Sequence, residues 1–237
     1  MNHIVALSGG KDSTAMALRL RELNPTVDYE FVITPTGDEL PPMVAHWKKL
    51  EVLLGKSLTV VSPGFTLVEL TKKHHMLPNF RARFCTKSLK IIPFLCWVQK
   101  HLPAVSYVGL RSDEEGRTGI ETTDFGDQFS TCFPLREWGW GICEVLEYLG
   151  RLEVAIPSRT DCARCFYQTL HEWWVLWKEY PDFYASAVDD EDRTKHTYRS
   201  EDRDTWPASL RELAEAFKTR GEPSQRSRTH DCKICRM

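Results

Sequence analysis

The first 135 residues alternate short apolar runs with longer segments of helical periodicity. Short apolar runs bounded by turn residues are typical of buried strands. Strands separated by helices form parallel sheets, because a parallel crossover needs a helix-sized connection. We therefore expect an α/β protein with a doubly wound, mostly parallel five-stranded sheet, whose ligands bind at the carboxyl ends of the strands. The expected strands are HIVAL (3–7), YEFVIT (29–34), SLTVV (57–61), VSYVGL (105–110) and STCFPL (130–135), and the expected helices are 12–23, 41–54 and 89–102, the last kinked near Pro93.

The second part of the chain has a different pattern, and no further strand is expected there. The segments 170–188 and 207–217 have helical periodicity and are separated by a highly charged stretch. We predict a nucleotide-binding α/β domain over residues 1–155 and a helical region over residues 156–237. Three residues of that region are expected to pack in its core rather than to form a base-stacking platform: Trp173, Trp174 and Trp177.

Composition limits the class of protein. Hydrophobic residues make up 42% of the 237 residues, which is enough for a substantial core. No apolar stretch is long enough to cross a bilayer, so no membrane partner is expected. A glycine-rich turn that begins at Ser8 leaves no room for a signal peptide, and we expect a cytoplasmic protein. In that compartment clustered cysteines indicate metal or redox chemistry rather than disulfide bonds.

Charge is distributed unevenly along the chain. The formal net charge of −2 argues against a protein that coats nucleic acid through bulk charge. Between Thr71 and Ser112, however, there is no Asp or Glu. Such a segment is either a solvated basic face or a surface that receives a polyanion. Its cations are Lys72, Lys73, Arg81, Arg83, Lys87, Lys90, Lys100 and Arg111.

The turn SGGKDS, residues 8–13, connects the first expected strand to the first expected helix. The backbone N–H groups of such a turn and the helix N-terminus attract anions, and Lys11, Ser8 and Ser13 add further donors for phosphate. The turn is not a Walker A loop, because Asp12 follows the lysine where Ser or Thr is required. Asp12 is compatible with phosphate if it caps the helix or holds Mg²⁺. A plain strand-to-helix turn capped by Asp12 or Ser13 is the structural alternative.

The string SGGKDS resembles, without a mismatch, the signature of the PP-loop ATP pyrophosphatases, which have the adenine nucleotide alpha hydrolase-like fold. Members of that superfamily cleave ATP between its α and β phosphates, usually to adenylate a substrate. The resemblance implies that ATP with Mg²⁺ binds here. Its implied nucleotide-binding residues are Ser8, Gly9, Gly10, Lys11, Asp12 and Ser13.

Three further segments resemble the phosphoadenosine phosphosulfate reductases, one branch of that superfamily. TPTGDELPP resembles their TG-x-E-x-P turn, and VGLRSDEEGR resembles their G-[IL]-R segment, with Glu115 in the place of a serine. The run PLREWGWGICEVLEYL resembles a third segment of that family through Pro134, Leu135, Trp138, Val145, Tyr148 and Leu149. The resemblance covers roughly the first 165 residues. It implies nucleotide contacts from Thr36, Gly37, Gly109, Arg111 and Arg117.

Two cysteine segments resemble those of the iron-sulfur members of this group. CTKSLKIIPF is similar to their C-C-x-x-x-K-x-x-P-L stretch, with Thr86 in the place of the second cysteine, and RTDCARC is similar to their R-x-x-C-x-x-C. The resemblance implies that Cys85, Cys162 and Cys165 supply three of the four thiolates of a [4Fe-4S] cluster. Four cationic neighbours would favour the thiolate form: Arg81, Arg83, Lys87 and Lys90.

Zinc is the alternative metal. The pairs Cys162/Cys165 and Cys232/Cys235 could form a tetrahedral Zn²⁺ site. The gap between the pairs is far longer than the usual spacing of about 15 to 20 residues, and zinc leaves Cys85 unexplained. A protein without metal is the third possibility. The remaining cysteines of the apolar runs are expected to be inert core residues: Cys96, Cys132 and Cys143.

Two features depart from the reductases. Assimilatory reductases have a degenerate PP-loop, whereas this loop is intact. They also end in a Glu-Cys-Gly-Leu/Ile-His segment with a nucleophilic cysteine, whereas this chain ends in THDCKICRM. Cys232 or Cys235 could act as that nucleophile or as the fourth cluster ligand.

An intact ATP loop together with a cysteine cluster resembles the thiolation enzymes, which include two-thiocytidine tRNA synthetases and the ATP pyrophosphatase subunit of DNA phosphorothioation systems. We therefore expect an ATP-dependent sulfur-transfer enzyme, with a nucleic acid or a small sulfonucleotide as substrate and a sulfur donor protein as a further partner. An oligomer is compatible with this interpretation. A sulfonucleotide reductase and a non-catalytic nucleotide-sensing module are the alternatives. The expected catalytic residues are Lys11, Asp12, Lys87, Lys90, Arg111, Cys232 and Cys235.

Overall fold

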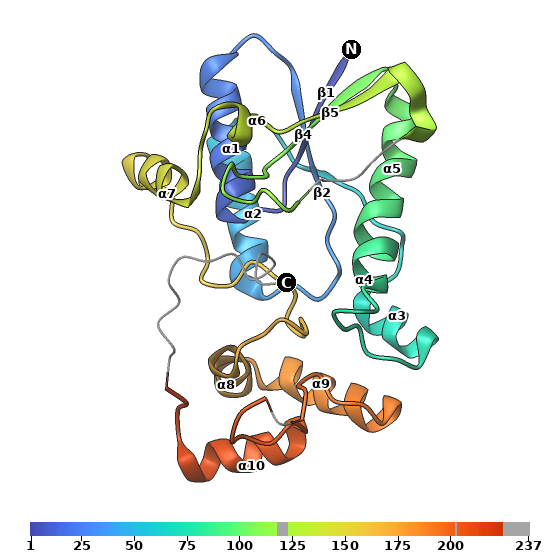
Figure 1. The fold of residues 1–237 in the computed structure, drawn as a ribbon, viewed down its shortest axis with the longest axis vertical. Coiled ribbons are helices and arrows are strands. Elements are labelled where there is room, and N and C mark those ends of the chain that lie inside the picture. The colour runs from blue at the N-terminus through green and yellow to red at the C-terminus, as the bar shows by residue number, and fades with distance from the viewer. Residues whose placement is uncertain (118–122, 202, 225–237) are drawn as a thin grey trace.

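A five-stranded parallel sheet forms the centre of the first part of the chain (Figure 1). The computed structural model describes residues 1–117, 123–201 and 203–224. The strand order is β3-β2-β1-β4-β5, and every neighbouring pair is parallel. The expected doubly wound α/β fold is thus confirmed. The strands are β1 (Asn2–Ala6), β2 (Tyr29–Ile33), β3 (Thr59–Val60), β4 (Ala104–Val108) and β5 (Phe129–Cys132).

Helices cover both faces of this sheet. The helices of this part of the chain are α1 (Lys11–Leu23), α2 (Pro41–Leu54), α3 (Leu67–His74), α4 (Phe84–Thr86), α5 (Ile92–Val98), α6 (Pro134–Glu137) and α7 (Ile142–Arg151), of which α1, α2, α5 and α7 pack against the sheet. Alternate strand side chains point to opposite faces. Val5 and Phe31 therefore pack with α1, α2 and α7 in one core, whereas Ile4 and Val32 pack with α5 in another. Figure 1 shows these two groups of helices on opposite sides of the strands.

The segment around Pro93 is helical over a longer range than expected. A π-helical turn, Lys87–Ile91, connects α4 to α5, and a 3₁₀ turn, Gln99–His101, follows α5. Pro93 has no N–H group to donate to the preceding turn. The widened turn therefore lies immediately before the proline, at the position where a kink was expected.

The strand order reverses at β1, because β2 and β4 lie on either side of it. In an open parallel sheet this reversal opens a crevice at the carboxyl ends of the strands. The turn after β1 and the loop after β4 meet at this crevice. The turn that was expected to bind nucleotide therefore lies at this edge of the sheet.

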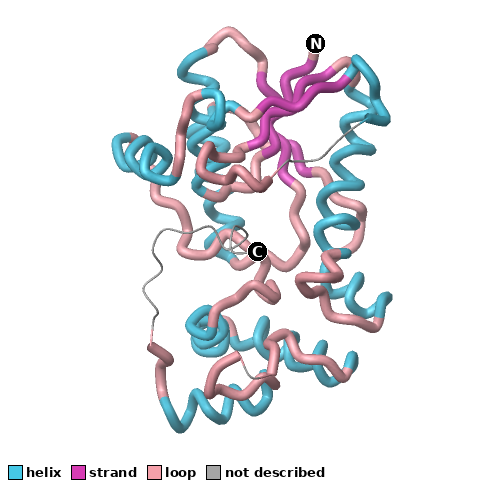
Figure 2. The backbone as a smooth tube through the Cα atoms, in the orientation of Figure 1, coloured by secondary structure: helices cyan, strands magenta, loops and turns pink. Residues whose placement is uncertain are grey.

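The described residues that follow α7 contain helices and no strand (Figure 2). The helices are α8 (Leu170–Glu179), α9 (Pro181–Thr194) and α10 (Leu210–Arg220). Trp173 and Trp174 are buried among them, and Trp177 packs against the same cluster, so the expectation that they form a core is confirmed. Figure 1 places these helices beyond one end of the sheet. The boundary at residue 155 stays a prediction.

The described cysteines are all free thiols, but two of them lie elsewhere than expected. Cys96 and Cys143 are exposed, so the expectation that they are core residues is wrong. Their helices bury other positions, Phe94 and Val98 in α5 and Val145 in α7. An apolar helical segment buries only one of its faces, and both cysteines lie outside that face. Cys132 is half-buried.

No helix in the described ranges has the length and apolar character needed to cross a membrane.

Candidate functional site

The turn after β1 is tightly packed against α2. Gly9 has φ +82°, and a Cβ atom at this position would lie 2.4 Å from Met43 Cε and 2.8 Å from Trp47 Nε1. Trp47 in turn donates a hydrogen bond of 3.2 Å to the Ser8 carbonyl. Only glycine combines this backbone conformation with such a close approach. The second residue of the pair, Gly10, is the N-cap of α1, so the helix begins at Lys11.

Two hydroxyl groups organise the same turn. Ser8 Oγ and Ser13 Oγ are 2.9 Å apart, the Gly9 amide donates to Ser13 Oγ at 3.2 Å, and the Gly10 amide donates to Ser8 Oγ at 3.2 Å. No side chain caps α1 at Gly10, so the alternative in which Asp12 or Ser13 caps this helix is not what the structure contains. The helix N-terminus is therefore left with donors and a partial positive charge that suit an anion.

Asp12 lies between two cations. Its Oδ2 atom is 3.2 Å from Lys11 Nζ and 3.1 Å from Arg111 Nη1. Its Oδ1 atom is buried and has no hydrogen-bond partner among the described residues. A carboxylate oxygen that is buried beside a phosphate-type loop and lacks a protein partner fits a Mg²⁺ ligand. Asp12 could therefore hold the metal of a Mg-nucleotide while its other oxygen stays paired.

The loop after β4 approaches the N-terminus of α1. A Cβ atom at Gly109 would lie 3.1 Å from Ser13 N and 3.2 Å from the Asp12 carbonyl carbon. The absence of a side chain thus lets the chain after β4 pass close to the first turn of α1. Arg111 follows on this loop, and its Nε donates to Asp113 at 2.8 Å. Burial alone would lower the pKa of Arg111, but the carboxylates of Asp12 and Asp113 raise it, and the guanidinium stays charged.

The rest of this loop is held by internal ion pairs. Arg117 Nη1 lies 3.1 Å from the buried Glu114 carboxylate, which also accepts the Arg111 amide at 3.1 Å. Arg136 Nη2 donates to the carbonyls of Glu114 and Arg117, each at 2.6 Å. Arg117 was expected to contact nucleotide, and the structure gives it a role in ordering the loop. Arg136 was missed, because nothing in the sequence relates it to a loop 19 and 22 residues earlier.

The turn after β2 carries the next two expected residues, Thr36 and Gly37. The Glu39 carboxylate accepts the Thr36 amide at 2.6 Å, the Thr36 hydroxyl at 2.7 Å and the Gly37 amide at 3.0 Å. Gly37 has φ +72°, and a Cβ atom there would lie 2.6 Å from Thr66 Cγ2. The donors of both residues therefore already have an acceptor, and Glu39 is the residue that shapes the turn.

The structure brings Cys85, Cys162 and Cys165 together from two distant segments. Cys162 forms a hydrogen bond with the Cys165 thiol, and Cys85 lies near Cys165. Cys85 and Cys162 pack against the same small cluster, which contains Leu89. The hydrogen bond with Cys165 and burial raise the pKa of Cys162, and burial raises the pKa of Cys85, whereas Lys90 opposes both shifts.

These thiols suit a soft metal centre in kind and number. Three converging cysteines match the ligand preference of iron-sulfur clusters and of Zn²⁺. In the described part of the chain, no three His, Cys, Asp or Glu side chains already have the arrangement of a metal site. Cys232 and Cys235 lie outside the described residues. Binding a metal would remove the thiol protons, and Lys90 is the cation placed to favour the thiolates.

The cysteines are close to the turn of residues 8–13. Thr160 Oγ1 would lie 3.5 Å from a Cβ atom at Gly10. Cys162 follows two residues later and pairs with Glu39 in an antiparallel bridge. Two residues of extended chain span at most about 7 Å. The turn of residues 8–13, the turn after β2 and the Cys162–Cys165 turn therefore lie next to one another.

Two arginine–aromatic pairs lie in the segments that carry these cysteines. The guanidinium of Arg83 lies 5.9 Å from the centre of the Tyr167 ring, and that of Arg81 lies 5.2 Å from the ring of Phe80, which is 55% exposed. Burial raises the pKa of Tyr167, while nearby Arg83 opposes the shift. Lys87 and Lys90 are exposed on the following π-helical turn. A basic and partly aromatic surface thus adjoins the thiols.

The comparison with known families agrees with this geometry. Residues 2–158 match the family model described as the phosphoadenosine phosphosulfate reductase domain. The chain belongs to this reductase family. No curated protein sequence matches it significantly.

Two solved structures share the fold of this family member. One is the phosphoadenylyl-sulfate reductase of Candida auris in a phosphate complex, with 15% identity and a TM-score of 0.51 over 66% of this chain and 75% of that one. The other is the U34-tRNA thiolase NcsA of Methanococcus maripaludis with its [4Fe-4S] cluster, with 17% identity and a TM-score of 0.53 over 92% of this chain and 81% of that one. Members of the family are thus enzymes, and the fold occurs both in a reductase and in a thiolase.

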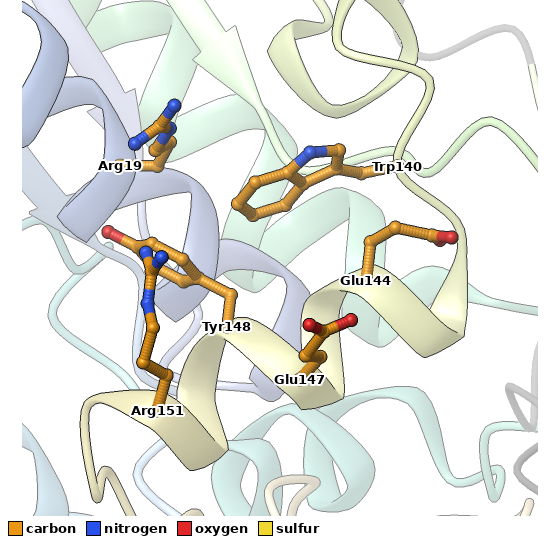
Figure 3. Close-up of a pocket in the computed structure, with 6 residues that line it drawn as sticks. All are labelled: Arg19, Trp140, Glu144, Glu147, Tyr148 and Arg151. Atoms are coloured by element: carbon orange, nitrogen blue, oxygen red, sulfur yellow. The ribbon is translucent and has the colours of Figure 1, made fainter.

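A separate surface pocket of about 220 Å³ lies between α1 and α7 (Figure 3). Trp140 and Tyr148 form its aromatic wall, with ring centres 5.0 Å apart. Its cations already have partners, because Arg19 pairs with Glu22 at 2.8 Å and Arg151 lies over the Tyr148 ring. Arg19 is about 12 Å along α1 from Lys11. The pocket is therefore distinct from the turn of residues 8–13.

Proposed function

We propose that this family member is an ATP-dependent sulfur-transfer enzyme that adenylates an acceptor, releases pyrophosphate and then replaces the activated oxygen with sulfur. The observation that supports this proposal most strongly is the short distance along the chain between the contact with the turn of residues 8–13 and the first cysteine of the pair. Thr160 lies at the Gly10 turn, and Cys162 follows two residues later. The turn of residues 8–13 has an intact PP-loop sequence, and it lies near the segment that carries Cys162 and Cys165. This arrangement suits a reaction that uses a nucleotide and a sulfur atom together.

The proposed reaction has two balanced steps. An acceptor oxygen attacks the α-phosphorus of ATP, the α–β bond breaks, and pyrophosphate leaves with the electron pair. A sulfur atom at the oxidation level of sulfide then attacks the activated carbon or phosphorus, and AMP leaves with the former acceptor oxygen. Neither step changes the net oxidation state, and one proton is released to solvent.

The residues of the turn at positions 8–13 have different roles in the first step. The Gly9 and Gly10 segment and the Ser8 and Ser13 hydroxyls orient the phosphates, and Lys11 balances the charge that develops on the leaving pyrophosphate. Asp12 would hold Mg²⁺ through Oδ1, the oxygen without a hydrogen-bond partner among the described residues, while Arg111 pairs with its other oxygen. These interactions position and stabilise charge rather than transfer protons.

The cysteines serve the second step. Cys85, Cys162 and Cys165 would hold an iron-sulfur cluster, with Cys232 or Cys235 as a fourth ligand, and such a cluster would supply a site that retains sulfur at the sulfide level. Lys87 and Lys90 capture the anionic acceptor or stabilise charge in the transition state. The exposed Phe80 and the acid-free segment from Thr71 to Ser112 favour a nucleic acid as that acceptor, because bases stack on aromatic rings and phosphates bind cations.

The test measures AMP and pyrophosphate release from ATP with tRNA, DNA or no acceptor, in the presence of sulfide. We expect release only with an acceptor, and a Lys87→Ala/Lys90→Ala variant should turn over more slowly while its metal content is unchanged. Lys100→Ala is the matched control, because Lys100 is exposed in the same acid-free segment at the far end of the helix. The proposal is contradicted if the rate of pyrophosphate release is the same with and without each acceptor, or if the double variant keeps full activity.

A sulfonucleotide reductase is the second candidate, and the family match favours it. In that reaction a thiolate attacks the sulfur of an adenylated sulfate, the nucleotide leaves, and a second thiol reduces the thiosulfonate to sulfite and a disulfide. Formation of sulfite and an adenosine phosphate from a sulfonucleotide would identify it. Tight ATP binding without any turnover would instead support a nucleotide-sensing module.

A further inference from the structure

Arg164, inside the Cys162–Cys165 turn, forms a bidentate ion pair with Asp38, in the turn after β2. Nε of Arg164 lies 3.1 Å from Asp38 Oδ2, and Nη2 lies 2.6 Å from Oδ1. The Arg164 amide also donates to Asp38 Oδ2 at 3.1 Å. Both side chains are almost fully buried, with exposed fractions of 3% and 1%. A buried and bidentate pair of this kind fixes both position and orientation.

Backbone contacts run beside this ion pair. The Ala163 amide donates to the Asp38 carbonyl at 2.6 Å, and Glu39 pairs with Cys162 in a β-bridge. The turn that carries two cysteines and the turn that carries Thr36 and Gly37 are therefore joined along their length. A shift of one turn would have to move the other.

The same guanidinium also reaches the C-terminal helices. Nη1 of Arg164 lies 2.9 Å from Asp190 Oδ2 and 3.0 Å from the Ser186 hydroxyl, both in α9. The Tyr198 hydroxyl donates to the same Asp190 oxygen at 3.2 Å. Burial alone would lower the pKa of Arg164, but Asp38 and Asp190 raise it, so the guanidinium remains charged.

We propose that Arg164 is a positioning residue that locks the cysteine turn to the turn after β2 and anchors both to α9. It contacts no reacting atom, and it sets where the thiols of Cys162 and Cys165 lie relative to the nucleotide site. Lysine cannot replace it, because an ammonium group cannot bind the Asp38 carboxylate in a planar fork and reach Asp190 at the same time. The lock is a property of the folded chain, and its importance for catalysis rests on the proposed function.

The test is site-resolved alkylation of the purified full chain under anaerobic conditions, read by peptide mass spectrometry. In Arg164→Lys, the alkylation rates of Cys162 and Cys165 should rise about tenfold or more, because losing charged hydrogen bonds makes local opening easier. The exposed Cys96 and Cys143 serve as internal references whose rates stay the same. If the protein carries a metal, release to a chelator should accelerate in the same variant.

The matched control is Arg199→Lys. Arg199 is 1% exposed and binds Asp204 through two contacts of 2.8 Å and 3.0 Å, but its contacts lie within the C-terminal region. An unspecific loss of stability should therefore affect both variants alike. Unchanged Cys162 and Cys165 rates in Arg164→Lys, or an equal rise in Arg199→Lys, overturns the proposal.

Asp38→Asn tests the same lock from the other side and is the variant to use if Arg164→Lys does not fold. We expect the same rise at Cys162 and Cys165, and unchanged rates there overturn the proposal. Because the thiol rates are measured without ATP or an acceptor, they stand even if the enzyme proves to have another reaction. ATP affinity and turnover of the same variants then show whether the lock also serves the proposed sulfur transfer.

Discussion

Arg111 and Asp12 form an ion pair of 3.1 Å although they are 99 residues apart in the chain. The pair joins the loop after β4 to the first turn of α1, across the point where the strand order reverses. It also explains how a carboxylate can lie in a phosphate-type turn, because one of its oxygens is neutralised by Arg111 and Lys11.

This pair should show strong coupling in a double-mutant cycle. Asp12→Asn and Arg111→Gln, alone and together, should give an interaction free energy of about 1–3 kcal/mol in urea unfolding, because the arginine side chain is only 4% exposed. Arg19 and Glu22 form the control pair, with exposed fractions of 30% and 48%, and should couple by less than about 1 kcal/mol. Equal interaction free energies in the two cycles would contradict the expectation that burial strengthens the Arg111–Asp12 pair.

Lys11→Ala should weaken ATP binding while the fold survives. A charge-assisted contact with phosphate is worth about 1.5–3 kcal/mol, so the Kd should rise roughly tenfold or more, as measured by calorimetry. Lys56→Ala is the control, because Lys56 pairs with Asp28 at 2.7 Å near the amino end of β2, away from the turn. Unchanged ATP affinity in a folded Lys11→Ala protein would falsify the phosphate role of the turn.

Gly9→Ala should lower the thermal stability of the protein more than alanine does at another glycine with a positive φ. Alanine at φ +82° costs about 1 kcal/mol in backbone strain, and its Cβ would also collide with Met43 and Trp47. Gly64→Ala is the matched control, because Gly64 has φ +85° but a Cβ atom there would meet no other atom within 4 Å. Thermal unfolding should show the larger loss for Gly9→Ala, together with a loss of ATP binding. Equal losses in the two variants would show that packing against α2 does not matter.

The cysteine cluster should bind iron. Protein purified without oxygen should be brown, contain iron and inorganic sulfide, and bleach in air. Serine at Cys85, Cys162 or Cys165 should abolish the colour, whereas Cys96→Ser should retain it because Cys96 is exposed on α5, away from the cluster. A colourless anaerobic preparation with stoichiometric zinc would instead establish the tetrahedral thiolate alternative.

Glu191 should make stability depend on pH. Burial raises its pKa to about 7, although the amides of Leu210 and Tyr198 oppose the shift. Because the folded state holds this proton more tightly than the unfolded state, the stabilisation is complete below the ordinary pKa of 4.5 and is lost as the pH rises through 7. The free energy of unfolding should fall by about 2 kcal/mol between pH 5.5 and 8.

Glu191→Gln should remove this pH dependence, measured by urea unfolding at both values. Glu179→Gln is the control, because Glu179 is exposed at the end of α8. If the wild-type protein and Glu191→Gln lose the same free energy over this range, another group is responsible.

The sequence by itself determined the five strands and their order along the chain, but it did not predict the helices α3 and α7. Each observed strand lies within its expected run or begins one residue before it, because short apolar runs and the turn residues that bound them are local properties of the chain. The turn at residues 8–13 was equally local, since its glycines, lysine and serines are contiguous. The family resemblance also placed Cys85 with Cys162 and Cys165.

Only the tertiary structure decided which distant groups meet. Arg164 was one charged residue among many in the sequence, and its pairing with Asp38, 126 residues away, has no local signal. The exposure of Cys96 and Cys143 likewise depends on which helical face packs against the sheet. Burial and long-range ion pairing arise when separate segments are brought together, so the connection between the Cys162–Cys165 turn and the turn after β2 is a property of the fold rather than of any one segment.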